Sequence, residues 1–258
     1  MDHLRWDLRQ IFEMAVVEDY IAKNPATLIF TPPEAKRPAN PVMTWEQVVL
    51  LLFFSPLGTR ELVICRLATV EGMRLGEIFG LQWRHVKADH IEVAQRLYRG
   101  RINGPRNDPS KRTFALSYTT RALISKWESL SGHPGQEAWV FPSETLKTPL
   151  SKDNCWRRWI APNLNGIGLG WLNFQVTRRT HSSLMGAMEV SPKIVADQLG
   201  HSVDVDLNVY TKTPLEVRQE AVEAFERKLE QEAAAKSSSS VMYWSTNGVR
   251  FIRTFPSY

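Results

Sequence analysis

A proline-rich segment divides this chain into two unequal parts. The stretch "KNPATLIFTPPEAKRPANP" holds five prolines between Pro25 and Pro41. Proline lacks a backbone donor and is excluded from helix interiors, so we expect this stretch to be extended. The apolar residues of 3–22 recur at helical spacing: Leu4, Leu8, Ile11, Phe12, Ala15 and Val16. One helix cannot bury such a stripe alone. We therefore expect residues 1–34 to be the remnant of a helical domain whose earlier part is missing, and 35–42 to be a linker.

The pattern after the linker predicts a mainly α-helical domain with a small antiparallel β-sheet, an α+β fold, over residues 43–235. "TWEQ" at 44–47 has the form of a capping box, which typically begins a helix. Between residues 84 and 117, apolar and polar residues alternate, which predicts two or three short antiparallel strands. Further helices are expected at 58–71, from 73, and at 118–130, 151–160, 175–189, 192–199 and 203–210.

The last helix is expected to begin at "TPLE", residues 213–216, which combines an N-cap, a proline at the first helical position and a capping-box glutamate. Its narrow apolar stripe consists of Leu215, Val222, Phe225 and Leu229. The low-complexity segment "AAAKSSSS" follows, and the remaining residues lack a helical period. Residues 236–258 are therefore expected to be a linker and a C-terminal tail.

Composition indicates a globular protein but leaves the function open. Among the 258 residues, 43% are hydrophobic and nine are tryptophan, and the formal net charge of +5 only weakly favours a polyanionic partner. Cys65 and Cys155 lack the spacing of a metal site, and Cys65 lies in an apolar run, which fits a reducing cytoplasm. No apolar run approaches the ~18 residues of a membrane span, and the charged N-terminus is not a signal peptide. We expect no membrane partner.

Three short segments carry residues that could perform chemistry. "EGMRLGEI" places Arg74 and Glu77 one helical turn apart, and "FQVTRRTH" does the same for Gln175 and Arg178. Taken singly, these pairs are typical of a surface ion pair and of a solvated basic face.

The third segment is "LGHSVDVDLNVY", which follows the expected C-cap of a helix. It holds His201 and, nine positions later, Tyr210. In this order, the three segments resemble the boxes of the tyrosine recombinase, or phage integrase, family. The resemblance covers about residues 41–232, and 3–40 is similar to the end of the family's core-binding domain. Three ordered motifs are far more specific than one.

The resemblance implies a site-specific DNA recombinase that cleaves and rejoins strands through a 3′-phosphotyrosyl intermediate. Tyr210 would be the nucleophile, which keeps the phosphate attached until a DNA hydroxyl attacks it. The guanidiniums of Arg74 and Arg178 would clamp the non-bridging oxygens in the transition state. His201 would bind the same phosphate or assist proton transfer, and Glu77 would orient its neighbours. The implied partner is double-stranded DNA, bound by a homotetramer, and no cofactor or metal is implied.

Two positions depart from the family's pattern. Gln175 stands where the family usually has histidine; an amide can donate a hydrogen bond to phosphate but cannot shuttle a proton. The family's general acid is a lysine in the strand region, and alignment back from "PSKRTFAL" places Arg106 there. Arginine does not give up its proton. Either Lys111 reaches the site from a shifted register, or Arg106 acts only electrostatically.

Other functions remain open from the sequence. The short first domain and the unusual tail after Ser240 also fit a DNA-binding remnant with weak or no recombination. A type IB topoisomerase would use the same residues, and a helical protein unrelated to nucleic acids is a further alternative. The apolar stripe of the last helix could pack within its own molecule or, as the resemblance implies, on a neighbouring protomer. The sequence specifies neither the DNA site nor the biological role.

Overall fold

The computed structural model describes residues 2–30, 40–104, 113–132, 134–200 and 215–243. The chain forms two compact units, Met1–Asn40 and Pro41–Tyr258. Among the described residues, none of the helices is both long enough and apolar enough to cross a membrane.

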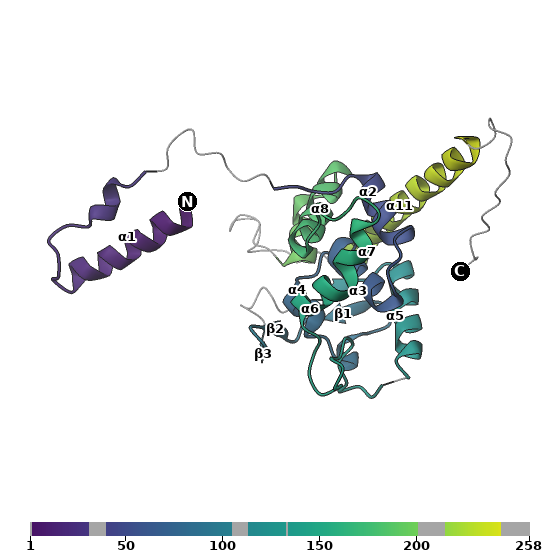
Figure 1. The fold of residues 1–258 in the computed structure, drawn as a ribbon, viewed down its shortest axis with the longest axis horizontal. Coiled ribbons are helices and arrows are strands. Elements are labelled where there is room, and N and C mark those ends of the chain that lie inside the picture. Colours follow the sequence, from purple (N-terminus) through teal and green to yellow (C-terminus); the bar gives the residue numbers. More distant parts are fainter. Residues whose placement is uncertain (1, 31–39, 105–112, 133, 201–214, 244–258) are drawn as a thin grey trace. The chain divides into compact units, whose positions relative to one another are not determined.

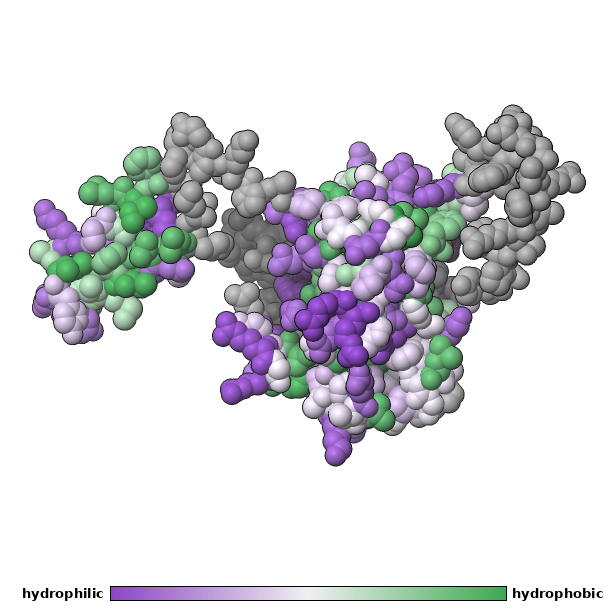
Figure 2. Space-filling model, in the orientation of Figure 1, coloured by the Kyte–Doolittle hydropathy of each residue, from purple (hydrophilic) through white to green (hydrophobic). Residues whose placement is uncertain are grey.

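The first unit contains helix α1 (Asp2–Val17) and the 3-10 helix η1 (Pro25–Leu28) (Figure 1). Arg9 Nε donates to the carbonyl of Ala26 at 3.1 Å, and Asn24 Nδ2 donates to the carbonyl of Arg9 at 2.9 Å. The helix expected over 3–22 ends earlier, at Val17. Hydrophobic side chains gather on the visible face of this unit (Figure 2). In the unit as a whole, Leu4, Trp6, Ile11, Met14 and Val17 are each at least 60% exposed.

Helix α3 (Thr59–Thr69) forms the centre of the second unit. Every residue from Val63 to Thr69 is buried, and α3 contacts α5 (Tyr118–Leu130) and α8 (Phe174–Ala187). Helix α2 (Trp45–Phe53) begins at the predicted capping box, in which Thr44 and Gln47 exchange hydrogen bonds. Cys65 lies in this core as expected, and both Cys65 and Cys155 are buried free thiols.

The C-terminal helix α11 (Leu215–Tyr243) packs on the same unit. It contacts α2, β4 (Thr113–Ala115) and α9 (Pro192–Leu199), and Val222, Phe225 and Leu229 are completely buried. The apolar stripe is therefore core within its own chain. The expectation of a linker beginning at residue 236 is wrong as far as Tyr243, because α11 continues through "AAAKSSSS". Alanine is the best helix former, so three alanines extend a helix that is already anchored.

The strands are shorter and more divided than the sequence predicted. Strand β1 (His90–Glu92) pairs antiparallel with β4, His90 facing Ala115, and β2 (Arg96–Tyr98) pairs with β3 (Arg101–Asn103). The described residues thus form two separate two-stranded sheets. Arg99 and Gly100, with φ of 50° and 74°, make the two-residue turn of the β2–β3 hairpin.

The remaining helices lie between the elements already described. Helix α4 (Leu75–Phe79) follows α3, and the 3-10 helix η2 (Trp83–His85) precedes β1. The helix expected over 151–160 is observed as α6 (Lys152–Cys155), a π-helical turn (Trp156–Ile160) and α7 (Ala161–Asn165).

Candidate active site

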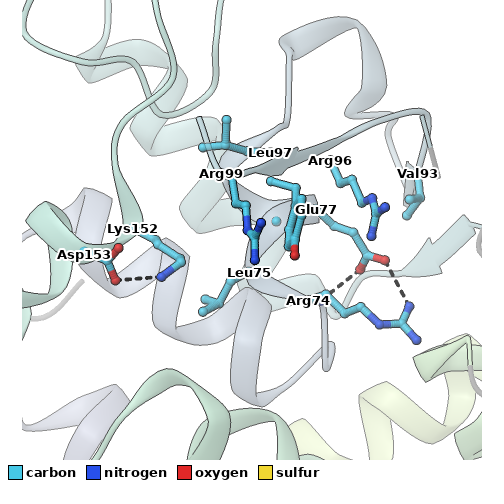
Figure 3. A pocket seen from close by; sticks show the side chains of 11 residues that line it. Arg74, Leu75, Glu77, Val93, Arg96, Leu97, Arg99, Lys152 and Asp153 are labelled. Carbon is cyan, nitrogen blue, oxygen red and sulfur yellow. Dashed lines mark hydrogen bonds and ion pairs between the residues drawn. The ribbon is translucent and has the colours of Figure 1, made fainter. Parts of the chain in front are cut away.

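Arg74 lies at the N-terminus of α4 and is fixed from two directions. Its backbone N–H donates to Glu77 Oε2 at 2.9 Å, and its side chain donates to Glu77 Oε1 at 3.1 Å. The other guanidinium nitrogen donates to the carbonyl of Gly200 at 2.8 Å. The Glu77 side chain is 5% exposed and that of Arg74 37%. A buried carboxylate therefore holds a half-exposed guanidinium in one orientation (Figure 3).

Arg178 reaches the same region from the middle of α8. Its guanidinium donates to the carbonyl of Gly72 and, at 2.7 Å, to the carbonyl of Leu199. Gly72 has a φ of 71°, and a Cβ there would lie 2.6 Å from Leu199 and 2.8 Å from His181. Glycine is required at this turn for both reasons, because other residues would be strained and would have no room.

The two arginines therefore converge on consecutive carbonyls at the end of α9. The final carbonyls of a helix lack intrahelical partners and carry partial negative charge, which favours cations. Helix α9 ends as predicted, with Gly200 in the left-handed conformation at φ 63°. In the sequence, the next residue is His201, the first of the His201–Tyr210 segment.

Gln198 holds this end of α9 in place, a role that the sequence did not indicate. Its side chain is buried; Nε2 lies 3.2 Å from the carbonyls of Glu71 and of Ala115, and Oε1 accepts from the Ala115 N–H at 3.3 Å. One amide thus connects α9 to β4 and to the chain just after α3. Only the tertiary arrangement identifies it, because an isolated glutamine in a helix carries no sequence signal.

The other candidate residues are placed less completely. Gln175 is exposed in the first turn of α8, whose N-cap is the Asn173 side chain. Arg106, Lys111, His201 and Tyr210 lie outside the described residues. The structure brings Arg74, Glu77 and Arg178 together, and the roles of all eight residues remain proposals. Within the described ranges, no group of three or more His, Cys, Asp or Glu side chains could hold a metal ion.

A buried histidine lies behind the arginine pair. His181 is completely buried, Nδ1 donates to the carbonyl of Thr69 at 3.2 Å, and Nε2 has no hydrogen-bond partner among the described residues. Burial, together with the positive charge of Arg178, lowers the pKa of His181 to about 4. His181 is therefore a neutral core residue at physiological pH.

Two buried carboxylates, Glu71 and Glu226, are influenced by the charge of Arg66. Arg66 forms an ion pair with Glu226 of α11 and donates to Thr120 Oγ1 at 3.0 Å. Glu71 accepts from the backbone N–H of Ser117 at 3.3 Å. Burial raises the pKa of Glu71 to about 7 and also raises the pKa of Glu226. This cluster connects α3, α5 and α11.

Comparison with solved structures supports the fold. The integrase of the Tn1549 transposon, solved with a circular intermediate DNA, has a TM-score of 0.64 and 16% identity, over 87% of this chain and 78% of that one. The integrase of mycobacterium phage Brujita has a TM-score of 0.54 and 16% identity, over 88% and 75% of the two chains. A lambda integrase dimer bound to a core site has a TM-score of 0.52 and 16% identity, over 81% and 74%. At this identity the likeness concerns the fold alone.

Sequence comparison identifies the family. A curated relative, a tyrosine recombinase XerC-like protein of Caldanaerobacter subterraneus subsp. tengcongensis, is 24% identical over 84% of this chain. The chain spans 63% of that relative's length. The model of the phage integrase family matches residues 41–216, which include all the candidate site residues. The chain therefore belongs to the phage integrase family.

Proposed function

We propose that the protein is a site-specific DNA recombinase that cleaves and rejoins DNA strands through a 3′-phosphotyrosyl intermediate. The observation that carries the proposal is the convergence of Arg74 and Arg178 on the carbonyls of Leu199 and Gly200, directly before the His201–Tyr210 segment. Family membership supports the same reaction. Double-stranded DNA is the proposed substrate, and the similar integrases of Tn1549 and lambda were solved with DNA.

In the proposed reaction, the Tyr210 oxygen attacks a backbone phosphorus. The new phosphorus–tyrosyl bond forms as the bond to the 5′-oxygen breaks, and the phenol proton leaves to a base. Negative charge grows on the non-bridging oxygens in the transition state. Two preorganised arginine forks suit that charge, because each can donate two parallel hydrogen bonds. A free 5′-hydroxyl then attacks the phosphotyrosyl bond and releases Tyr210.

Glu77 and His201 would support the arginine pair. Glu77 is buried against Arg74 and would keep its guanidinium from rotating away from the phosphate. His201 would donate to the same phosphate or accept the phenol proton, while Gln175 would contribute only a neutral hydrogen bond.

The leaving 5′-oxygen needs a proton, and two residues are candidates for its source. Lys111 can donate one, whereas Arg106 can only stabilise the developing charge. Lys111→Ala should slow cleavage strongly if Lys111 is the acid. A substrate with a 5′-bridging phosphorothiolate has a leaving group that needs no proton, so it should restore the rate of that variant.

We also propose that several copies assemble on DNA as a homotetramer. Strand exchange between two duplexes needs four cleavage events, which favours four protomers. Analytical ultracentrifugation with and without duplex DNA would test this. A single protomer on every DNA tested would contradict it.

The decisive experiment uses a nicked suicide DNA substrate, from which the released fragment diffuses away. Wild-type protein should form a covalent protein–DNA adduct, and Tyr210→Phe should abolish it because the nucleophile is missing. Tyr118→Phe is the matched control, since Tyr118 is an exposed tyrosine on α5. Binding without an adduct from the wild type would instead indicate a DNA-binding remnant. Relaxation of plasmids lacking any recognition site would indicate a topoisomerase.

A further inference from the structure

A second cationic site adjoins the arginine pair. A cavity of about 400 Å³ opens between α4, the β2–β3 hairpin and α6 (Figure 3). Its lining includes four cationic side chains, Arg74, Arg96, Arg99 and Lys152, against two acidic ones, Glu77 and Asp153. Since Glu77 is already paired with Arg74, the part of the cavity away from Arg74 carries an excess of positive charge.

Gly76 of α4 and Gly80, which follows the helix, bring the hairpin close enough to form this cavity. A Cβ on Gly76 would lie 2.7 Å from the carbonyl oxygen of Leu97, and one on Gly80 would lie 3.1 Å from the Cα of Arg96. Strand β2 therefore packs directly on the helix backbone. This packing places Arg96 and Arg99 on the same cavity as Arg74 (Figure 3).

The cations of the hairpin are held in position without being neutralised. The guanidiniums of Arg96 and Arg99 lie 5.5 Å and 5.3 Å from the centroid of the Tyr98 ring, within the range of cation–π attraction. Arg96 Nε is buried and has no hydrogen-bond partner among the described residues. Lys152 is paired with Asp153, but both side chains are at least half exposed, so this ion pair is weak and can be exchanged.

We propose that this cavity binds a second backbone phosphate of the DNA strand, next to the one held by Arg74 and Arg178. The guanidiniums of Arg96 and Arg99 and the ammonium of Lys152 would donate to the phosphate oxygens. The proposal rests on the proposed function, because it takes DNA as the substrate. It adds a site whose residues position the strand but do not take part in cleavage.

The test measures binding of a random-sequence 30-base-pair duplex by fluorescence anisotropy as a function of salt. Each phosphate neutralised contributes about 0.9 to the slope of log K against log salt concentration. Arg96→Gln and Arg99→Gln should each weaken binding several-fold. In the double variant, Arg96→Gln with Arg99→Gln, the slope should fall by about 0.9 in total. The loss of affinity should be smaller than the two single losses combined, because both cations hold one phosphate. Lys228→Gln, which removes a cation on α11 outside the cavity, should change neither quantity.

Two outcomes would overturn the proposal. One is unchanged affinity in the double variant; the other is fully additive losses with a slope change of about 1.8, which would indicate two independent surface contacts. If Arg96→Gln does not fold, the pair Arg99→Gln and Lys152→Gln gives the same test at exposed positions. The suicide-substrate assay separates this result from the proposed function. Adduct formation at saturating protein should survive these substitutions, whereas failure of the wild type to form any adduct would refute the recombinase itself.

Discussion

At the level of single residues, the site depends on a few side chains that hold the phosphate-binding arginines, or the carbonyls that they contact, in position. Glu77 carries no phosphate-binding group, yet its buried carboxylate contacts Arg74 through both the backbone and the guanidinium. Gln198 bonds to the carbonyls of Glu71 and Ala115 and so anchors the end of α9, whose last carbonyls accept from the two arginines. Such positioning residues affect the rate of a reaction through geometry, because a misplaced guanidinium no longer meets the charge of the transition state.

Glu77→Gln should slow cleavage about 10- to 100-fold. The substitution keeps the side-chain volume but removes a charge-assisted hydrogen bond in a buried setting, which is worth ~1.5–3 kcal/mol. Single-turnover adduct formation on the suicide substrate measures the effect, and the affinity for DNA should stay nearly constant. The control is Glu144→Gln, which removes an exposed carboxylate paired with Arg158. A loss of affinity without a change in rate would contradict a positioning role.

At the level of elements, local signals predicted the helices where they were strong. The helices predicted over 118–130 and 192–199 match α5 and α9; the Ser117 side chain caps the start of α5, and Gly200 ends α9. The pairing of the strands into two sheets was not predictable, because a strand of only three residues carries little information about its register. The arginine pair was predictable from its motifs, whereas the contacts of Gln198 and the close packing on Gly76 depend on elements far apart in sequence.

The docking of α11 gives a prediction at this level. Phe225 is completely buried, with its ring centroid 5.2 Å from that of Trp45 and 5.8 Å from that of His181. Phe225→Ala should lower the free energy of unfolding by ~3–5 kcal/mol, as expected for an aromatic side chain removed from a core. Urea denaturation followed by circular dichroism measures it. Val217→Ala, a half-exposed position on the same helix, should cost less than ~0.5 kcal/mol. A loss below ~1 kcal/mol at Phe225 would mean that α11 is not packed on its own chain in solution.

For the whole molecule, the buried titratable groups couple folding to pH in opposite directions. The pKa of Glu71 is raised from 4.5 to about 7, so the folded state holds a proton that the unfolded state has lost between these values. This contribution stabilises the protein at low pH and is lost as the pH rises through 7. The raised pKa of Glu226 acts in the same direction. The pKa of His181 is lowered from 6.5 to about 4, so its contribution is present above 6.5 and is lost as the pH falls toward 4.

Between pH 4.5 and 6.5 the contributions of Glu71 and His181 oppose one another and cancel, and Glu226 adds to that of Glu71, so the wild-type stability should fall as the pH rises across that window. Glu71→Gln removes the carboxylate, keeps an acceptor for the Ser117 N–H, and so removes the contribution of Glu71 to the pH dependence. Relative to the wild type, the variant's stability should then decrease as the pH falls from 6.5 to 4.5, while at pH 8 it should exceed that of the wild type, because no buried charge remains at position 71. Urea denaturation midpoints of the wild type and of the variant, measured at intervals of half a pH unit, give the stability of each protein as a function of pH. The cluster of Glu71, Arg66 and Glu226 joins α11 to the core. If the plots of stability against pH for the two proteins run parallel, Glu71 is not buried in solution, and the packing of α11 against this cluster is not formed as described.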